Sequence, residues 1–173
     1  MEAWFEDEAR FGQQGTLTRV WAPRGSRPRA VRQTQYDYLW VLTAVCPGTG
    51  AAEGLISPSL NTGVVNVFLA QLSASLAPDV HAVLFWDGAG FHTAKALDVP
   101  ENISLERLPP RSPELMPVEN LWHYEREHFW ANTKYADYAA LEQAARDGWR
   151  AVCLDPAKVK SVCAAPYLTE RAE

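Results

Sequence analysis

The chain reads VHAVLFWDGAG from Val80 to Gly90. The nearly continuous apolar run that ends at Trp86 is typical of a parallel strand buried by helices on both faces. Asp87 follows directly at the carboxyl end of this strand, which is where open α/β sheets place their ligand sites. The segment therefore predicts an α/β fold with Asp87 at the functional edge of its sheet.

A second acidic residue stands in the middle of a strand near the start of the chain. Residues alternate from Trp4 to Phe11, and the two-residue period of a strand places Asp7 on the same face as Phe5 and Ala9. A carboxylate thus interrupts an otherwise apolar face. Because burying an unpaired carboxylate is costly, Asp7 is a candidate functional residue.

The other segments before residue 80 predict an antiparallel meander followed by one helix. Strands are expected at residues 18–22 and 36–46, with a short further strand at 52–56, because Gly and Pro bound runs that favour extended structure. Asn61 and Thr62 are candidate N-caps of a helix whose apolar residues recur at helical spacing until a proline ends the pattern.

The residues after Asp87 predict one more strand and two helices. The strand is expected at 103–108, and a helix begins near Pro117, a residue suited to a first helical turn. The apolar stripe of that helix consists of Val118, Leu121, Trp122 and Phe129. A last helix is expected from about Tyr138 to Val152. No internal repeat or low-complexity linker appears, so residues 1–173 are interpreted as one domain.

The composition fits one globular domain but weighs against a nucleic-acid enzyme. Of the 173 residues, 47% are hydrophobic and 21% are charged, which suits a compact core. The formal net charge is −5 at pH 7, whereas phosphate contacts draw on Lys and Arg. The basic residues are uneven, however, and one short stretch holds Arg19, Arg24, Arg27, Arg29 and Arg32. This stretch is equally compatible with a solvated loop and with a DNA contact.

The cysteines and the apolar runs indicate the compartment. Cys46, Cys153 and Cys163 are far apart, odd in number and without C-x-x-C spacing, which argues against a disulfide framework or a zinc knuckle. The chain has no leader-like segment and no apolar run near the roughly 20 residues that a membrane-spanning helix needs. We therefore expect a cytoplasmic protein that has no membrane partner.

Three acidic residues stand out by position: Asp7 within a strand, Asp87 after a buried strand, and Glu119 in the first turn of a helix. Each alone has an ordinary structural explanation, as an Asx turn or as a partner of the helix dipole. Together they could hold two Mg²⁺ ions, which prefer hard oxygen ligands and suit in-line displacement at phosphorus. Glu6 and Glu8 are expected to face away from Asp7, unless a β-bulge brings Glu8 across.

Four segments stand out as motifs: FEDEARFG (residues 5–12), WAPRG (21–25), WDGAGFH (86–92) and LPPRSPELMPVENLW (108–122). In this order they resemble the motifs of bacterial insertion-sequence transposases of the mariner superfamily. The resemblance covers nearly the whole chain, and the last segment is the most specific. One departure is Met116, which stands where the family usually has Asn and removes a polar group beside the third acid.

The resemblance implies a ribonuclease-H-like fold, in which an antiparallel three-strand meander is followed by parallel strands and flanked by helices. It implies that the DDE triad of the family corresponds to Asp7, Asp87 and Glu119, as catalytic ligands of two Mg²⁺ or Mn²⁺ ions. The implied partners are transposon-end and target DNA, bound by a homodimer at the bacterial nucleoid. The helix-turn-helix domains of the family are not found here, so the chain resembles the catalytic domain alone.

The sequence is therefore interpreted as the catalytic domain of a cut-and-paste DNA transposase, which cuts phosphodiesters at transposon ends and transfers the strand into target DNA. His92, Lys95, Arg111 and Arg24 are candidate phosphate contacts, although packing or surface charge explains each equally well. Two alternatives stay open. One is a ribonuclease-H-like nuclease without strand transfer, and the other is an inactive or domesticated remnant that acts as a binding module.

Overall fold

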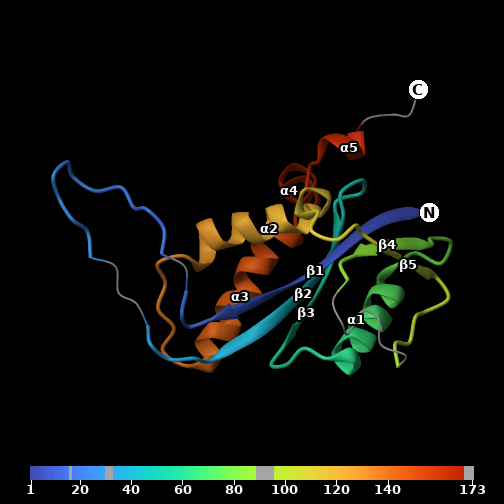
Figure 1. The fold of residues 1–173 in the computed structure, drawn as a ribbon, viewed down its shortest axis with the longest axis horizontal. Helices are drawn as coiled ribbons and strands as arrows, with labels where there is room; N and C mark the ends of the chain where they lie inside the picture. Colours follow the sequence, from blue (N-terminus) through green and yellow to red (C-terminus); the bar gives the residue numbers. More distant parts are fainter. Residues whose placement is uncertain (16, 30–32, 89–95, 170–173) are drawn as a thin grey trace.

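The computed structural model describes residues 1–15, 17–29, 33–88 and 96–169. A five-stranded mixed sheet lies at the centre of the molecule, with strand order β3-β2-β1-β4-β5 (Figure 1). Its strands are β1 (Glu2–Gly12), β2 (Tyr38–Cys46), β3 (Ala51–Ser57), β4 (Ala82–Trp86) and β5 (Ile103–Arg107). The first three pair antiparallel, whereas β4 is parallel to both β1 and β5. The sheet confirms the predicted meander followed by parallel strands.

Helices cover both faces of this sheet. They are α1 (Thr62–Ser75), α2 (Pro117–Glu125), α3 (Tyr138–Cys153), α4 (Pro156–Val162) and α5 (Pro166–Thr169), with a 3-10 turn at Pro113–Leu115 and a π-helical turn at Arg126–Trp130 that continues α2. α1 packs on one face, and α2, α3 and α4 pack on the other. Asn61 caps α1 as predicted, since its side chain accepts a hydrogen bond from the Val64 N–H at 3.1 Å. Within the described ranges, none of the helices has the length and apolar character to cross a membrane.

The central strands are buried on both faces because their apolar side chains alternate between two cores. On β1, Phe5 packs into the core beneath α2 and α3, whereas Trp4 packs beneath α1. On β2, Val41 and Leu42 divide between the two cores in the same way. Asp7 therefore shares the face of Phe5, as the alternation predicts, and that face is the one covered by α2.

The predicted strand at residues 18–22 is wrong. After β1 the chain leaves the sheet, and residues 17–29 form an exposed arm without a strand (Figure 1). Val20 is 53% exposed and Trp21 is fully exposed, so the alternating side chains have no surface to pack against. The third strand of the meander is β3, which the sequence predicted only as a short further strand.

One residue of the predicted stripe on α2 is also wrong, and the short helices α4 and α5 were not predicted. Phe129 is 36% exposed, whereas its neighbour Trp130 is buried. The π-helical turn adds a residue to the helical repeat, so the register advances by one and Trp130 faces the core. There its ring packs on Phe11, with centroids 4.4 Å apart. All three cysteines are free and buried, in agreement with the expectation of no disulfide framework.

Candidate active site

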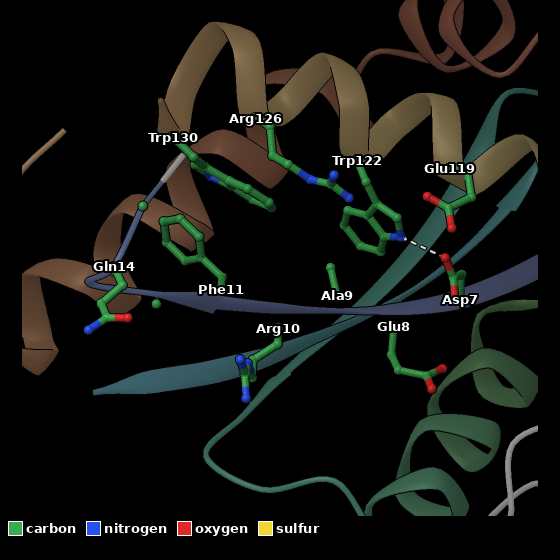
Figure 2. A pocket seen from close by; sticks show the side chains of 12 residues that line it. Asp7, Glu8, Ala9, Arg10, Phe11, Gln14, Glu119, Trp122, Arg126 and Trp130 are labelled. Atoms are coloured by element: carbon green, nitrogen blue, oxygen red, sulfur yellow. Dashed lines mark hydrogen bonds between the residues drawn. The ribbon is translucent and has the colours of Figure 1, made fainter. Parts of the chain in front are cut away.

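Asp7 lies at the middle of β1 and faces the start of α2. Its backbone pairs with Thr43 of β2 in the central ladder. The indole N–H of Trp122 donates a hydrogen bond to Asp7 Oδ2 at 3.0 Å. Glu119, one turn earlier on α2, points toward the same carboxylate (Figure 2). Strand and helix therefore hold two acidic side chains against each other.

The third acid reaches the same place from the neighbouring strand. The parallel ladder pairs Phe5 with Phe85, so Asp87, two residues beyond Phe85, lies at the level of Asp7. Asp7, Asp87 and Glu119 line one hollow of about 460 Å³, which we call the triad hollow. The three acids chosen from the sequence thus lie together, although they come from three separate elements.

Ionisation of the Asp7 carboxyl group is energetically unfavourable in these surroundings. Burial, and then the negative charge of Glu119, raise the pKa of Asp7 from 3.8 to about 7. Asp87 adds a further repulsion, whereas the hydrogen bond from Trp122 favours the charged form of Asp7. A carboxylate that is costly to ionise beside other carboxylates is stabilised by a cation.

The donor chemistry of the group fits a hard divalent cation. Its three side chains offer carboxylate oxygens, the ligands that Mg²⁺ and Mn²⁺ prefer. In the part of the chain that the structure describes, no group of three His, Cys, Asp or Glu side chains is arranged to hold a metal ion as it stands. The fit therefore rests on the type of donor and on the repulsion at Asp7 that a cation would relieve.

A second hollow extends from the same acids along β1 and is drawn in Figure 2. It measures about 400 Å³, and its lining includes Asp7, Glu119, Trp122, Arg126 and Trp130. The side chain of Arg126 reaches toward Trp122 on the same side of β1 as the two acids. We call this space the aromatic hollow. A ligand at the acids would therefore meet aromatic rings and a cation along one direction.

The other predicted contacts are divided between the site and the rest of the molecule. Arg111 lines the triad hollow, where its backbone has a φ of 59°. Arg24 lies on the exposed arm and lines neither the triad hollow nor the aromatic hollow. His92 and Lys95 lie outside the described residues, so their predicted contacts stay predictions.

Sequence reasoning missed Arg107, which also lines the triad hollow. Arg107 ends β5 and pairs with Trp86 in the parallel ladder, so it lies beside the residue that precedes Asp87. Its Nε is 3.6 Å from the position that a side-chain carbon on Gly88 would occupy. The available signal was its place at the carboxyl end of a predicted strand, which is the edge where such sheets bind ligands.

The burial of Glu6 and Glu8 was also missed. The ladder between β1 and β2 continues without a bulge from Phe5 to Gly12, so Glu8 stays on the face opposite Asp7, as Figure 2 shows. Burial and then the charges of Asp7 and Asp87 raise the pKa of Glu8 to about 8, and burial with neighbouring acids raises the pKa of Glu6 well above its ordinary value. The strand therefore carries acids on both faces at the level of the site.

Comparisons with known proteins identify the family and the fold of the chain. The sequence profile described as "DDE superfamily endonuclease" matches residues 2–142. The uncharacterized protein y4pE/y4sA of Sinorhizobium fredii (strain NBRC 101917 / NGR234) is 38% identical over 125 residues, which are 72% of this chain and 93% of the relative.

Solved structures show the same fold. The Mos1 transposase paired-end complex with left transposon end superposes with a TM-score of 0.70 at 16% identity, over 94% of this chain and 51% of that chain. The Mos1 mariner paired end complex with Mn gives a TM-score of 0.67 at 18% identity, over 94% and 51%. This chain spans about half the length of those transposase chains. The predicted ribonuclease-H-like fold class is confirmed, and by its sequence the chain belongs to the DDE superfamily endonuclease family.

Proposed function

We propose that this chain is the catalytic domain of a cut-and-paste DNA transposase. The observation that carries the proposal is the meeting of Asp7, Asp87 and Glu119 at the triad hollow of a DDE superfamily chain. In this proposal residues 1–173 act as a single catalytic domain, and two copies work together on transposon-end and target DNA in the bacterial nucleoid. The likeness to the Mos1 paired-end complex supports the choice of DNA as substrate.

Asp7, Asp87 and Glu119 would hold Mg²⁺ or Mn²⁺, with two ions at full occupancy. When bound, such ions activate a water or a 3′-hydroxyl and neutralise charge on the phosphate and the leaving oxygen. The similarity to a Mos1 mariner complex with Mn supports this choice of cation. The donor set of this chain agrees with it, because all three side chains offer carboxylate oxygens.

The remaining side chains of the site bind and orient. The Trp122 N–H fixes one oxygen of Asp7, which holds the carboxylate in one orientation. Arg107 and Arg111 in the triad hollow, with Arg126 in the aromatic hollow, offset the charge of the acids and attract a phosphodiester. These arginines reduce the weight of the net charge of −5, because they line the two hollows where the proposal places a phosphate.

The test is the nicking of a DNA duplex in Mn²⁺ by the wild type and by Asp7→Asn. The proposal predicts metal-dependent nicks in the wild type and their loss in Asp7→Asn. Glu114→Gln is the matched control, because Glu114 is an exposed acid in the same region that lines neither hollow. Equal cutting by wild type and Asp7→Asn would overturn the assignment.

A second measurement with the same proteins distinguishes a transposase, which joins DNA strands, from a nuclease, which only cuts them. Pre-cut ends carrying a free 3′-hydroxyl are offered with a target duplex, and joined products are measured. Joining by the wild type supports strand transfer. Nicking without joining assigns the chain to the nuclease alternative, and no metal binding or cutting assigns it to the inactive alternative.

A further inference from the structure

A third hollow lies at the base of the exposed arm and is separate from the acids. It measures about 520 Å³ and is lined by residues of the arm and of the turn that follows the π-helical segment. Its charged lining residues are Arg19, Arg29 and Lys134, all of them cations. We call it the basic hollow. Nothing in the proposed chemistry at the triad hollow requires it.

The basic hollow is held in place by hydrogen bonds between segments far apart in the sequence. Asn132 adopts a left-handed backbone with φ 58°, a conformation that Asn tolerates better than most residues. Its side chain accepts from the Thr18 N–H at 3.2 Å and donates to the Thr18 carbonyl and hydroxyl oxygens at 3.3 and 3.1 Å. These hydrogen bonds hold the start of the arm, at Thr18, against the turn that carries Lys134.

The second leg of the arm is clamped to the same turn. The side chain of Gln33 donates to the Tyr135 carbonyl at 2.7 Å and accepts from the Tyr135 N–H at 2.7 Å. Tyr135 itself is buried and packs edge-on against Phe11 of β1. The segments that carry the cations of the basic hollow are thus held to the rest of the fold by hydrogen bonds and by the packing of Tyr135.

Among the residues that the structure describes, the cations of the basic hollow have no acidic partner. No acidic side chain lines it, and within residues 1–15, 17–29, 33–88 and 96–169 none of Arg19, Arg29 and Lys134 forms an ion pair. Like charges gathered around one concave space repel one another and raise the local potential for anions. In a chain with a net charge of −5, this concentration of cations favours an anionic ligand.

The route from the acids to the basic hollow follows β1 and α2. Asp7 is bonded to Trp122, Phe11 packs on Trp130, and Thr18 is bonded to Asn132. These contacts show that the two segments run side by side in the same direction. The helical residues from Glu119 to Trp130 rise about 16 Å at about 1.5 Å per residue. Asn132 lies two residues beyond the end of the helix, so it is roughly 20 Å from Glu119, which corresponds to about six base pairs at about 3.4 Å per step along one strand.

We propose that Arg19, Arg29 and Lys134 bind phosphates of the DNA backbone about six base pairs from the phosphate at Asp7 and Glu119. This inference rests on the proposed function, because it takes DNA as the ligand. The aromatic hollow lies between the two contacts, so one duplex spans the acids, Arg126 and the basic hollow. The three cations set the position of the duplex and take no part in the reaction.

The test compares duplex binding by the wild type, by the triple variant R19Q/R29Q/K134Q and by the control triple variant R146Q/K158Q/K160Q. The control removes the same charge from exposed residues on α3 and α4. Affinity is measured at several salt concentrations in Ca²⁺, without cutting. We expect the hollow variant to bind at least about tenfold more weakly than the control and to have a salt slope smaller by about 2.7, at about 0.9 for each of the three phosphate contacts.

The position of the contact is tested with duplexes shortened in steps on either side of the nick site. The difference between the hollow variant and the control should vanish when one side, and only that side, is cut to about three base pairs. Equal affinity and salt slope in the two triple variants would overturn the inference. So would a difference that persists on the shortest duplexes of both series.

The outcome is distinguishable from a failure of the proposed function. If the wild type binds but does not cut in Mn²⁺, the proposed function fails, while the loss of binding in the hollow variant still supports the basic hollow. If the wild type cuts and both triple variants bind alike, the basic hollow fails and the proposed function stands. Thermal unfolding of each variant verifies that all three proteins are folded.

Discussion

Glu119 and Glu125 lie at opposite ends of α2, and their surroundings differ in every respect. Glu119 is exposed in the first turn, where it faces Asp7 across the triad hollow. Glu125 in the last turn is 0% exposed, and neither of its carboxylate oxygens has a hydrogen-bond partner among the described residues. One residue type on one helix therefore lines the candidate site at one end and is a buried, destabilising carboxyl group at the other.

The difference shows that the surroundings of a glutamate carboxyl group determine its role. The helix N-terminus and the opposed Asp7 make the position of Glu119 suited to a shared cation. Glu125 lies near the buried thiols of Cys153 and Cys163, and burial raises the pKa of its carboxyl from 4.5 to about 8. Substitutions at the two ends of α2 should therefore separate activity from stability.

The largest expected effect is on cutting. Glu119→Gln should reduce Mn²⁺-dependent nicking at least about a thousandfold, because it removes an anionic ligand of the ion that lowers the barrier. Its unfolding free energy should change by less than about 0.5 kcal/mol, since the side chain is exposed. Glu125→Gln should keep nicking within about threefold of the wild type. Comparable losses of nicking in the two variants would contradict the assignment of different roles to Glu119 and Glu125.

The next effect is on stability against pH. Below pH 4.5 Glu125 is neutral in the folded and unfolded chain, so it imposes no ionisation penalty. Between pH 4.5 and about 8 only the unfolded chain ionises, so stability falls as pH rises, and above about 8 the penalty stays constant. We expect this group to contribute a loss of about 5 kcal/mol across the window.

Glu125→Gln should flatten that part of the pH profile, measured by urea unfolding at pH 4.5, 6 and 8.5. The control is Glu127→Gln, two residues along the chain, where an exposed Glu pairs with His123 at 3.5 Å. The control should keep the wild-type profile within about 0.5 kcal/mol. A profile of Glu125→Gln identical to that of the wild type would show that the buried carboxyl does not set the pH dependence.

A smaller effect is expected at the hydrogen bond between Trp122 and Asp7. Trp122→Phe keeps an aromatic ring in the core but removes the donor that holds Asp7 Oδ2. We expect nicking to fall about tenfold, which corresponds to about 1.4 kcal/mol. The half-saturating Mn²⁺ concentration should rise as well, because the carboxylate loses its orientation. An unchanged Mn²⁺ dependence would assign Trp122 to packing alone.

The smallest effect is expected at the clamp of the arm. Asn132→Gly retains a residue that adopts positive φ but removes the hydrogen bonds to Thr18. The site is exposed, so we expect a loss of about 1 kcal/mol or less in unfolding free energy. Hydrogen exchange should quicken at the Thr18 amide and leave β1 protected. Unchanged exchange at Thr18 would mean that the clamp does not hold the arm.

Alternation and strand ends singled out the acids of the candidate site, and the family resemblance combined them into one triad. The period of two in β1 oriented Asp7, and the buried run before Asp87 placed it at the carboxyl edge of the sheet. The position of Glu119 followed from the proline that starts α2. All three are local signals, readable within about ten residues of each acid.

The rest depended on neighbours that lie far apart in the sequence. Arg107 joins the site only because β5 pairs with β4 in a register that sets it beside Trp86. The burial of Glu6 on the face covered by α1 follows from the central place of β1 in the strand order. The register shift that buries Trp130 in place of Phe129 comes from a π-helical turn, for which the helical spacing gave no signal. Tertiary context decided each of these.

The most direct measurement of the central claim is Mn²⁺ binding to the DNA-free protein, followed by the electron paramagnetic resonance of free Mn²⁺. The account predicts saturable binding by the wild type and by Glu114→Gln, and its loss in Asp87→Asn, although Asp87 lies in a different element from Asp7 and Glu119. Equal binding by wild type and Asp87→Asn, or none by the wild type, would contradict the claim that the three acids form one cation site.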